Sequence, residues 1–390
     1  MKKPLRPFLF AALFLLFSAL LSFSAWADDR VLNILYTGAI RGELEPCGCA
    51  PETQSGGLAR LSGFINAERA ALDPFILVDA GNALAADTPQ GRLKTEALLK
   101  SFRVIGYDVA ALFDVPAFAR PLLKETGLRA LSSKALVRSV TVKRGHLKIN
   151  VSVDPNARKN GMLNLLLTDK PVSEAASLGW DVVITSSGET TEGADKTTGP
   201  IVASGYPKGE KLGVISLRLD GNGRVSGFDQ RWQTLGKDVA EDARVREVLK
   251  GYDAKVVELT KDEEKKTALA GPWLGAVACI ECHEPFFESW AATRHSKAFA
   301  SLEKAGKSRD PECVVCHTTG YGKEGGFISK TTTPGLVGVQ CEVCHGPGKD
   351  HARGFSAPSG PVNETVCLKC HTKENSPEFD YELYREKIIH

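Results

Sequence analysis

The sequence has little of several features that mark special classes of protein. Its 49 lysine and arginine residues nearly balance its 47 aspartate and glutamate residues, which argues against a nucleic-acid partner. No apolar run after residue 23 is long enough to cross a membrane, which excludes a polytopic membrane protein. Ten cysteines in 390 residues are too few for a small disulfide-stapled fold. The remaining composition, 43% hydrophobic and 25% charged, predicts two or three globular domains.

The first 27 residues are typical of an export signal. Lys2, Lys3 and Arg6 precede an uncharged, largely apolar run over residues 8–23, and small residues Ala25 and Ala27 follow it. The alternative is a retained membrane anchor, but a spanning helix needs about 20 apolar residues, more than this run has. We therefore predict that residues 1–27 are a signal peptide, that the mature chain is periplasmic, and that no stable membrane span remains after cleavage.

Eight of the ten cysteines lie in four copies of one motif. The copies are Cys279-x-x-Cys282-His283, Cys313-x-x-Cys316-His317, Cys341-x-x-Cys344-His345 and Cys367-x-x-Cys370-His371. This spacing is that of c-type haem attachment, in which two thiols bond to the porphyrin edge and the adjacent histidine reaches the iron. Zinc sites and thioredoxin-like pairs also use Cys-x-x-Cys, but neither explains a histidine after every pair. We predict four covalently bound haem c groups with these histidines as proximal ligands.

The second axial ligands can be counted because methionine and histidine are scarce. The chain has two methionines; Met1 leaves with the signal and Met162 is far from the motifs, so bis-histidine irons are expected rather than Met/His irons. The histidines outside the motifs are His146, His295, His351 and His390. We predict His295, His351 and His390 as distal ligands and His146 as a surface residue. One iron is then five-coordinate, unless His146, Met162 or a lysine reaches it.

The positions of two distal candidates indicate which irons they reach. A proline opens a predicted helix over residues 285–299, which places His295 about 15 Å along the helix, too far from His283 to share its iron. His351 follows His345 through a loop too short to pass round a porphyrin. Both are therefore predicted to ligate neighbouring haems, an arrangement that packs the haems together.

Residues 272–390 give 119 residues for four predicted haems, so the haems themselves must supply most of the core. Frequent glycine and proline predict a mainly α, loop-rich cytochrome c domain of short helices. With residues 290–295 upstream and 341–351 downstream, this stretch resembles the tetrahaem cytochrome family that accepts electrons from hydroxylamine oxidoreductase. The resemblance implies stacked haem pairs, mostly bis-histidine, with one five-coordinate iron.

The amino-terminal part has a different pattern, in which short apolar runs alternate with helical stretches. It predicts an α/β domain over residues 28–236, with helices on both sides of a mixed sheet. The expected strands cover residues 31–36, 74–79, 109–113, 148–153, 162–167, 182–185 and 212–219, and the expected helices 58–71 and 93–105. Charged residues with apolar positions at helical spacing predict a linking helix within residues 237–271.

Four segments of this domain, residues 35–42, 56–60, 77–82 and 106–112, resemble in order the metallophosphoesterase domain of periplasmic 5′-nucleotidases. That family binds two metals and hydrolyses phosphate esters on a layered sandwich fold. The positions that the resemblance implies as metal ligands read Ala39, Arg41, Asn82 and Phe113 with Asp114, and residues 185–189 replace the terminal histidine segment. Only Asn82 can still ligate. We therefore predict the fold without the phosphatase activity.

The last two cysteines, Cys47 and Cys49, lie one residue apart in a glycine-bounded loop after the first strand. Such a pair forms a strained, easily reduced disulfide, binds a soft metal, or stays free. We predict that they are redox thiols, and the alternative is an inert loop.

These observations predict a periplasmic tetrahaem cytochrome that transfers electrons between redox protein partners. In this hypothesis the amino-terminal domain docks a partner or senses a ligand. The alternative is an oxidoreductase that acts on a small inorganic nitrogen or sulfur compound at a five-coordinate haem or at the Cys47 and Cys49 thiols. A third interpretation is ligand binding without turnover. An electron carrier is favoured over an enzyme.

Overall fold

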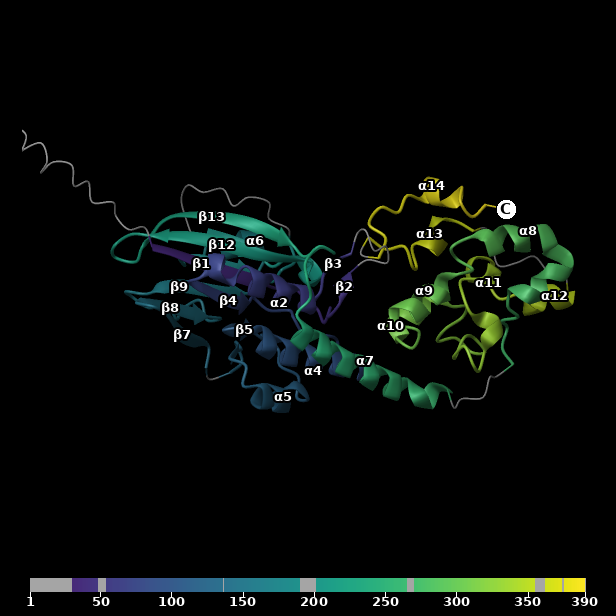
Figure 1. Ribbon diagram of the computed structural model, residues 1–390, viewed down its shortest axis with the longest axis horizontal. Coiled ribbons are helices and arrows are strands. Elements are labelled where there is room, and N and C mark those ends of the chain that lie inside the picture. The colour runs from purple at the N-terminus through teal and green to yellow at the C-terminus, as the bar shows by residue number, and fades with distance from the viewer. Residues whose placement is uncertain are drawn as a thin grey trace, which may run out of the picture.

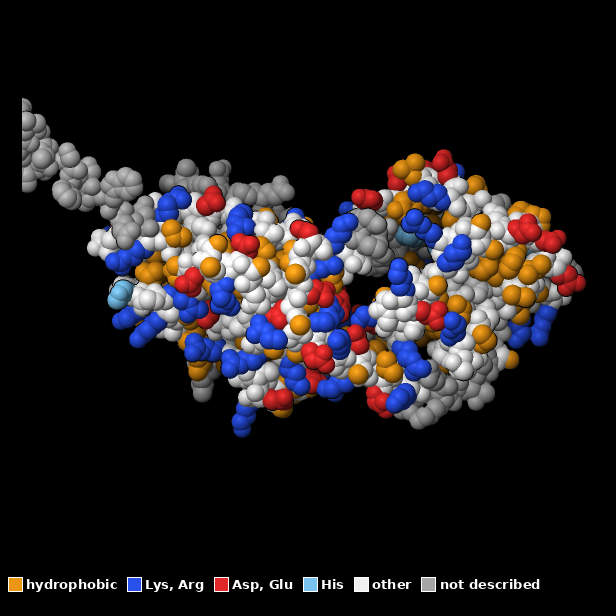
Figure 2. All heavy atoms as spheres, viewed as in Figure 1, with side chains coloured by type: hydrophobic (Ala, Val, Ile, Leu, Met, Phe, Trp, Pro, Cys, Tyr) orange, Lys and Arg blue, Asp and Glu red, His pale blue; other side chains and the backbone are white. Residues whose placement is uncertain are grey.

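The computed structural model describes residues 30–47, 54–135, 137–189, 201–264, 270–354, 362–373 and 375–389. The predicted signal peptide, Cys49, His390 and the side chain of Cys47 lie outside the described residues. The chain forms two bodies side by side along its long axis, a sheet-rich amino-terminal body and a helical carboxy-terminal one (Figure 1). Lysine, arginine, aspartate and glutamate side chains are interspersed over the face in view in Figure 2, as the balanced composition predicts.

The first sheet of the amino-terminal body has six strands in the order β13-β12-β1-β4-β5-β6. The strands are β1 (Arg30–Thr37), β4 (Phe75–Asp79), β5 (Val109–Ala111), β6 (Ala130–Leu131), β12 (Lys211–Leu219) and β13 (Val225–Thr234). Strands β1, β4, β5 and β6 are parallel neighbours, and β12 and β13 extend the sheet antiparallel. The carboxyl ends of β1, β4 and β5 therefore lie at one edge of the sheet.

A second sheet of five strands, in the order β11-β10-β9-β8-β7, lies against the first. Its strands are β7 (Ser139–Arg144), β8 (Leu147–Ser152), β9 (Leu163–Thr168), β10 (Val182–Thr185) and β11 (Ile201–Ser204). Ile34 of β1 and Leu165 of β9 are fully buried in one core shared by both sheets. The expectation of a single mixed sheet between helices was wrong, because β1 and β9 are buried on both faces and each sheet therefore needs two covering layers.

Helices cover the outer face of the first sheet. They are α2 (Leu58–Ala67), α3 (Arg69–Leu72), α4 (Pro89–Ile105), α5 (Ala119–Thr126) and α7 (Ala243–Glu264), with α6 (Val172–Ala175) on the second sheet and a small hairpin of β2 (Pro46–Cys47) and β3 (Ser55–Gly56). Leu98 of α4 and Leu249 of α7 are fully buried in the core between these helices and the first sheet. Helix α7 lies within residues 237–271, and its apolar side packs on α4 in the core of the amino-terminal body.

Each strand expected from the sequence is present, but β2, β3, β6, β7, β11 and β13 were missed. β2, β3 and β6 have only two residues each. β7 and β13 are edge strands whose residues are mostly half-buried or exposed, so their apolar alternation is weak. β11 is an edge strand of only four residues.

The carboxy-terminal body consists of short helices and loops, as predicted. They are η2 (Ala276–Cys279), α8 (Ile280–Ala292), α9 (Ala298–Ala305), α10 (Pro311–His317), η3 (Pro334–Leu336), α11 (Cys341–His345), α12 (Lys349–Gly354), α13 (Glu364–Cys367) and α14 (Tyr381–Arg385). Among the described residues of this body, the apolar core cluster is small, with five buried side chains: Phe299, Leu302, Val314, Phe327 and Leu336.

The prediction of a helix over residues 285–299 is wrong at both ends. Helix α8 begins at Ile280, contains Pro285 and is kinked at His283, because proline removes the bond to the residue four positions earlier. It ends at Ala292, and Thr293 is extended with its hydroxyl donating to the Trp290 carbonyl. His295 therefore lies in the turn between α8 and α9 and not along a helix.

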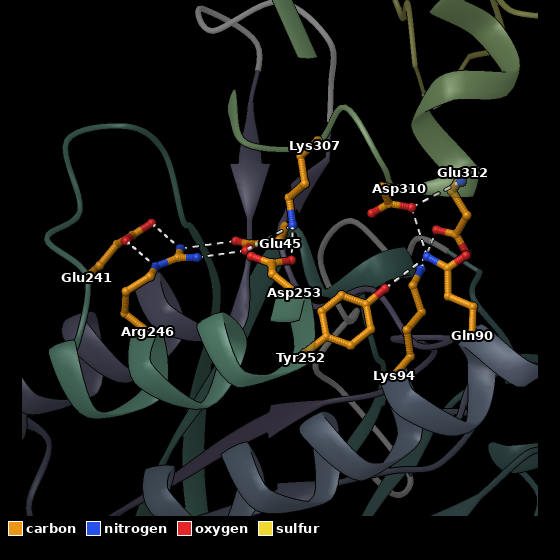
Figure 3. A network of polar contacts seen from close by, with 10 residues as sticks. All are labelled: Glu45, Gln90, Lys94, Glu241, Arg246, Tyr252, Asp253, Lys307, Asp310 and Glu312. Atoms are coloured by element: carbon orange, nitrogen blue, oxygen red, sulfur yellow. Dashed lines mark hydrogen bonds and ion pairs between the residues drawn. The ribbon is translucent and has the colours of Figure 1, made fainter. Parts of the chain in front are cut away.

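The two bodies meet where the start of α10 lies against α4 and α7 (Figure 3). Gln90 of α4 donates to Asp310 at 2.8 Å, and Lys94 of α4 forms an ion pair with Glu312 at 2.6 Å. Lys307, just before α10, pairs with Asp253 of α7 at 2.6 Å. The contact between the bodies is therefore polar and partly buried.

Candidate haem sites

Each Cys-x-x-Cys-His motif lies on a short helix or a helical turn. Asp310 caps α10 by accepting from the Glu312 amide, Pro311 follows it, and the helix ends at His317, so α10 holds the second motif. The third motif is the whole of α11, and the fourth continues from α13 through a turn in which the His371 amide donates to the Cys367 carbonyl. Helical spacing places the two thiols and the histidine of a motif on one side.

The structure brings the four motifs together through their thiols. Cys279 of the first motif lies near enough to Cys341 of the third for each thiol to shift the pKa of the other, and the same holds for Cys316 of the second motif and Cys370 of the fourth. Burial and the nearby Cys367 raise the pKa of Cys344, which connects the third motif with the fourth. None of the eight described cysteines forms a disulfide bond. The motifs thus pack as two pairs, first with third and second with fourth.

Two of the predicted distal histidines lie opposite proximal ones. The rings of His283 and His351 have centroids 6.1 Å apart with planes 29° from parallel. The rings of His295 and His371 are also 6.1 Å apart, with planes 53° from parallel. Neither distal candidate faces the histidine of the motif nearest to it in sequence. Ligation of neighbouring haems by these two histidines stays a prediction, and the ring positions are compatible with it.

These separations fit an iron held between two imidazoles. Metal–imidazole bonds are about 2 Å long and each ring centre lies about 1 Å further, so the centroids of a ligand pair are about 6 Å apart. Burial lowers the pKa of both His295 and His371, which favours the neutral imidazole that binds metals. The donor set, two thiols beside each histidine pair, is that of haem c.

The backbone around His295 is held in place by the segment that precedes the third motif. The Val339 amide donates to the His295 carbonyl at 3.0 Å, and the Trp290 indole donates to the Val339 carbonyl at 2.8 Å. Gly338 has φ +88°, and a Cβ there would lie 2.9 Å from the Ser296 carbonyl oxygen. Glycine at this position allows the close approach that fixes the His295 turn.

The other histidines are placed differently. The Nδ1 atom of His317 lies 2.7 Å from the Ala298 carbonyl, a bond that orients a ligating ring. His146 is exposed in the turn between β7 and β8, as predicted, and Met162 precedes β9. His390, predicted as a distal ligand, lies outside the described residues.

Sequence reasoning missed Glu342, a buried carboxylate between the two cysteines of the third motif. It is 3% exposed and accepts backbone bonds from Leu274, Gly275 and Gly348 at 2.7 to 3.1 Å. These donors precede the first motif and the helix that carries His351. Glu342 therefore holds together three segments that the first and third haems need. Its position inside a motif gave no signal of burial.

We predict that Glu342→Gln destabilises the carboxy-terminal body. The amide nitrogen cannot accept the backbone bonds that the carboxylate takes, and each buried donor left unpaired costs about 1–3 kcal/mol. Thermal unfolding of the haem-loaded protein measures the loss. Glu364→Gln, at the exposed start of α13, is the matched control. Equal unfolding temperatures for the two variants would contradict this role.

The positions matched to phosphoesterase ligands also come together, at the carboxyl ends of β1, β4 and β5. The amides of Ala39 and Arg41 donate to the carbonyls of Gly81 and Asn82, and the Asn82 side chain donates to the Ser186 carbonyl at 3.0 Å. Ala39, Arg41 and Asn82 keep φ values of 53° to 57°, a left-handed conformation that non-glycine residues rarely adopt. Asn82, the one position that can still ligate, is thus bonded to the backbone.

A buried aspartate supports this edge. Asp79, at the end of β4, accepts from the Thr37 hydroxyl at 2.7 Å and from the Gly81 amide at 3.0 Å. Burial raises its pKa to about 7. Among the described residues, no group of three or more histidine, cysteine, aspartate and glutamate side chains is arranged to hold a metal ion.

The Cys47 and Cys49 loop begins close to the helical body. Glu45 binds Arg246 of α7 at 2.7 and 3.0 Å and lies 3.8 Å from Lys307. Pro46 and Cys47 then pair with Ser55 and Gly56 as β2 and β3. The redox role predicted for these thiols falls on groups outside the described residues and stays a prediction.

The fold and the motifs define the class of this chain: an α/β domain with a metallophosphoesterase-like fold, followed by a helical region that carries four Cys-x-x-Cys-His motifs. Residues 278–346 match the family described as Cytochrome c554 and c-prime. Cytochrome c-554 of Nitrosomonas europaea is 36% identical over 122 residues, 27% of this chain and 52% of that protein. The chain thus spans about half the length of this relative.

Solved structures similar to this chain are phosphoesterase folds. A 5′-nucleotidase precursor from Thermus thermophilus has a TM-score of 0.52 and 16% identity, covering 71% of this chain and 68% of its own. The calcineurin-like phosphoesterase YfkN from Bacillus subtilis has a TM-score of 0.50 and 15% identity, covering 60% and 99%. At these identities the likeness establishes the fold, and the layered sandwich predicted for the amino-terminal domain is confirmed. No helix among the described residues is both long and apolar enough to cross a bilayer.

Proposed function

We propose that this chain is a periplasmic tetrahaem c-type cytochrome that transfers electrons between redox protein partners. The observation that carries the proposal is the convergence of four Cys-x-x-Cys-His motifs with two distal histidines, each 6.1 Å from a proximal ring. The proposed organisation is a signal peptide (1–27), an α/β domain (28–236), a linking helix (237–271) and a tetrahaem domain (272–390).

The proposed residue roles follow from this geometry. The eight motif cysteines attach four haems, and His283, His317, His345 and His371 are the proximal ligands. His351 completes the site of His283, and His295 completes the site of His371. Bound haem supplies reversible one-electron chemistry at iron, with low potentials where both axial ligands are histidine. Contact between the motifs, within each pair and between the pairs, supports a short path for electrons through the domain.

The haem content and redox cycling of the full chain test this proposal. The chain is produced in a host that attaches haem c, and its haem is counted from the pyridine haemochrome spectrum and the intact mass. We expect four haems per chain, all reduced by dithionite and reoxidised by a small one-electron acceptor. A purified full-length chain that carries no covalent haem would overturn the proposal.

A second candidate function is an oxidoreductase for a small inorganic nitrogen or sulfur compound. It is favoured by the histidine count, since His317 and His345 need distal ligands and His390 is the one histidine of this region not yet assigned. Electron paramagnetic resonance before and after addition of nitric oxide or carbon monoxide counts open irons. One iron that binds the gas rapidly supports this function, and four unreactive low-spin irons leave electron transfer alone.

We further propose that the α/β domain does not hydrolyse phosphate esters. A two-metal hydrolase needs carboxylate and imidazole ligands that hold two ions a few ångströms apart, and the matched positions here are Ala39, Arg41, Asn82 and Phe113. We therefore predict no hydrolysis of 5′-nucleotides or a chromogenic phosphate ester above the buffer rate with added Mn²⁺, Zn²⁺ or Mg²⁺. Release of phosphate that depends on added metal and disappears with chelator would refute this prediction.

A further inference from the structure

The contact between the two bodies is concentrated at the first turn of α10, the helix that carries the second haem motif (Figure 3). Gln90 donates to both the Asp310 carboxylate, at 2.8 Å, and the Tyr252 hydroxyl, at 3.0 Å. Lys94 reaches Glu312 at 2.6 Å. Two residues of α4, Gln90 and Lys94, thus bind the two carboxylates that open α10, and Tyr252 of α7 accepts from Gln90.

The side chain of Lys94 is only 11% exposed, while that of Glu312 is 55% exposed. Burial acts to lower the pKa of Lys94, but the bond to Glu312 and the charges of Glu312, Glu43 and Asp310 raise it overall. The amine is therefore a fixed positive charge at neutral pH. It faces more than one carboxylate at the start of α10.

These charges lie close to the second haem motif. Helix α10 has seven residues and is about 10 Å long, at 1.5 Å per residue. Glu312 is next to Cys313, and the Asp310 carbonyl accepts from the Cys313 amide at 2.9 Å. Charges at this range that are partly buried are screened less than surface charges. The net charge at the first turn of α10 therefore acts electrostatically on a haem attached to the second motif.

We propose that Lys94, a residue of the α/β domain, sets the redox potential of the haem attached to Cys313 and Cys316. Reduction of that haem by one electron removes one positive charge from the site, so a nearby cation favours the reduced form and raises the potential. Lys94 does this by offsetting Asp310 and Glu312. The amino-terminal domain then has a defined role in electron transfer as a fixed electrostatic support. This inference rests on the proposed attachment of haem to the second motif.

Reciprocal charge changes test the proposal in the full-length holoprotein by spectroelectrochemical titration. Lys94→Met keeps the length of the side chain and removes its charge, and we expect one of four midpoint potentials to fall. Glu312→Gln removes a negative charge, and we expect the same potential to rise. The double variant should return it towards the wild-type value, and Lys94→Arg should leave it unchanged. Lys255→Met is the matched control, because the half-exposed Lys255 of α7 pairs with Glu96 of α4 and not with a carboxylate of α10.

Shifts of the midpoint potential in opposite directions for Lys94→Met and Glu312→Gln distinguish an electrostatic effect from structural damage to the contact between the two bodies. If Lys94→Met and Glu312→Gln shift the potential in the same direction, or Lys94→Met shifts none, the inference is overturned although four haems are bound. Glu312→Gln keeps the test decisive should Lys94→Met fail to fold. Absence of covalent haem from the wild-type chain would instead overturn the proposed function.

Discussion

Replacing His351 by alanine is expected to convert one low-spin haem into a high-spin haem that binds carbon monoxide when reduced. The reason is the His283 and His351 pair, whose ring centroids lie 6.1 Å apart, the separation of two imidazoles on one metal. Alanine removes one axial ligand and opens a coordination position. Electron paramagnetic resonance should show one more high-spin iron per chain than in the wild type. His295→Ala should do the same at the iron of His371.

A matched control and a combined variant make this result specific. His146→Ala changes an exposed histidine of the α/β domain and should leave all spin states unchanged. In a chain that also lacks Cys279 and Cys282, His351→Ala should add no further high-spin iron, because the haem that it serves is absent. A high-spin signal that still appears in this combined variant would assign His351 to another iron.

Replacing both Cys313 and Cys316 by alanine is expected to reduce the haem content from four to three per chain. Each haem c needs the two thiols of one motif for attachment. The haemochrome absorbance should therefore fall by about a quarter, and the intact mass should fall by the mass of one haem. The structure adds that α10 contacts both Lys94 and the fourth motif. We therefore expect a second effect, a lower unfolding temperature, because the missing haem is part of the core.

The double variant Cys47→Ser with Cys49→Ser is the control for this measurement. These cysteines belong to no Cys-x-x-Cys-His motif, so four haems should remain. If the chain without Cys313 and Cys316 still carried four haems, the assignment of the second motif would be wrong. If the Cys47 and Cys49 variant lost a haem, these thiols would take part in haem attachment.

In the arrangement of the two bodies, the phosphoesterase-like domain supports a helix of the carboxy-terminal body. The α/β domain keeps the left-handed backbone at Ala39, Arg41 and Asn82, the positions matched to metal ligands, although these side chains do not form a two-metal ligand set. Backbone strain of this kind persists only where the surrounding structure determines it. On the helical side of the first sheet, α4 binds the first turn of α10, and α7 forms an ion pair with Lys307 just before that helix. The surface of the α/β domain that contacts α10 is therefore the helical one.

The sequence by itself determined the haem motifs and the class of both domains. The Cys-x-x-Cys-His spacing is set by the covalent chemistry of one porphyrin, so it is local and can be read without a fold. The same holds for β1, β4 and β9, whose buried apolar runs identify them as strands. The scarcity of methionine and histidine limited the axial ligands to a few named residues before any contact was known.

Only the tertiary structure decided which residues meet. The pairing of His283 with His351 and of His295 with His371 joins segments 68 and 76 positions apart, and no local pattern encodes such a contact. The helix predicted around His295 failed because α8 ends before Thr293, whose hydroxyl donates to the Trp290 carbonyl, so His295 lies in a turn. The sequence likewise did not predict the burial of Glu342 and Lys94, since a charged side chain is normally exposed. Their partners come from distant segments, and only packing brings those segments near enough to offset the loss of water.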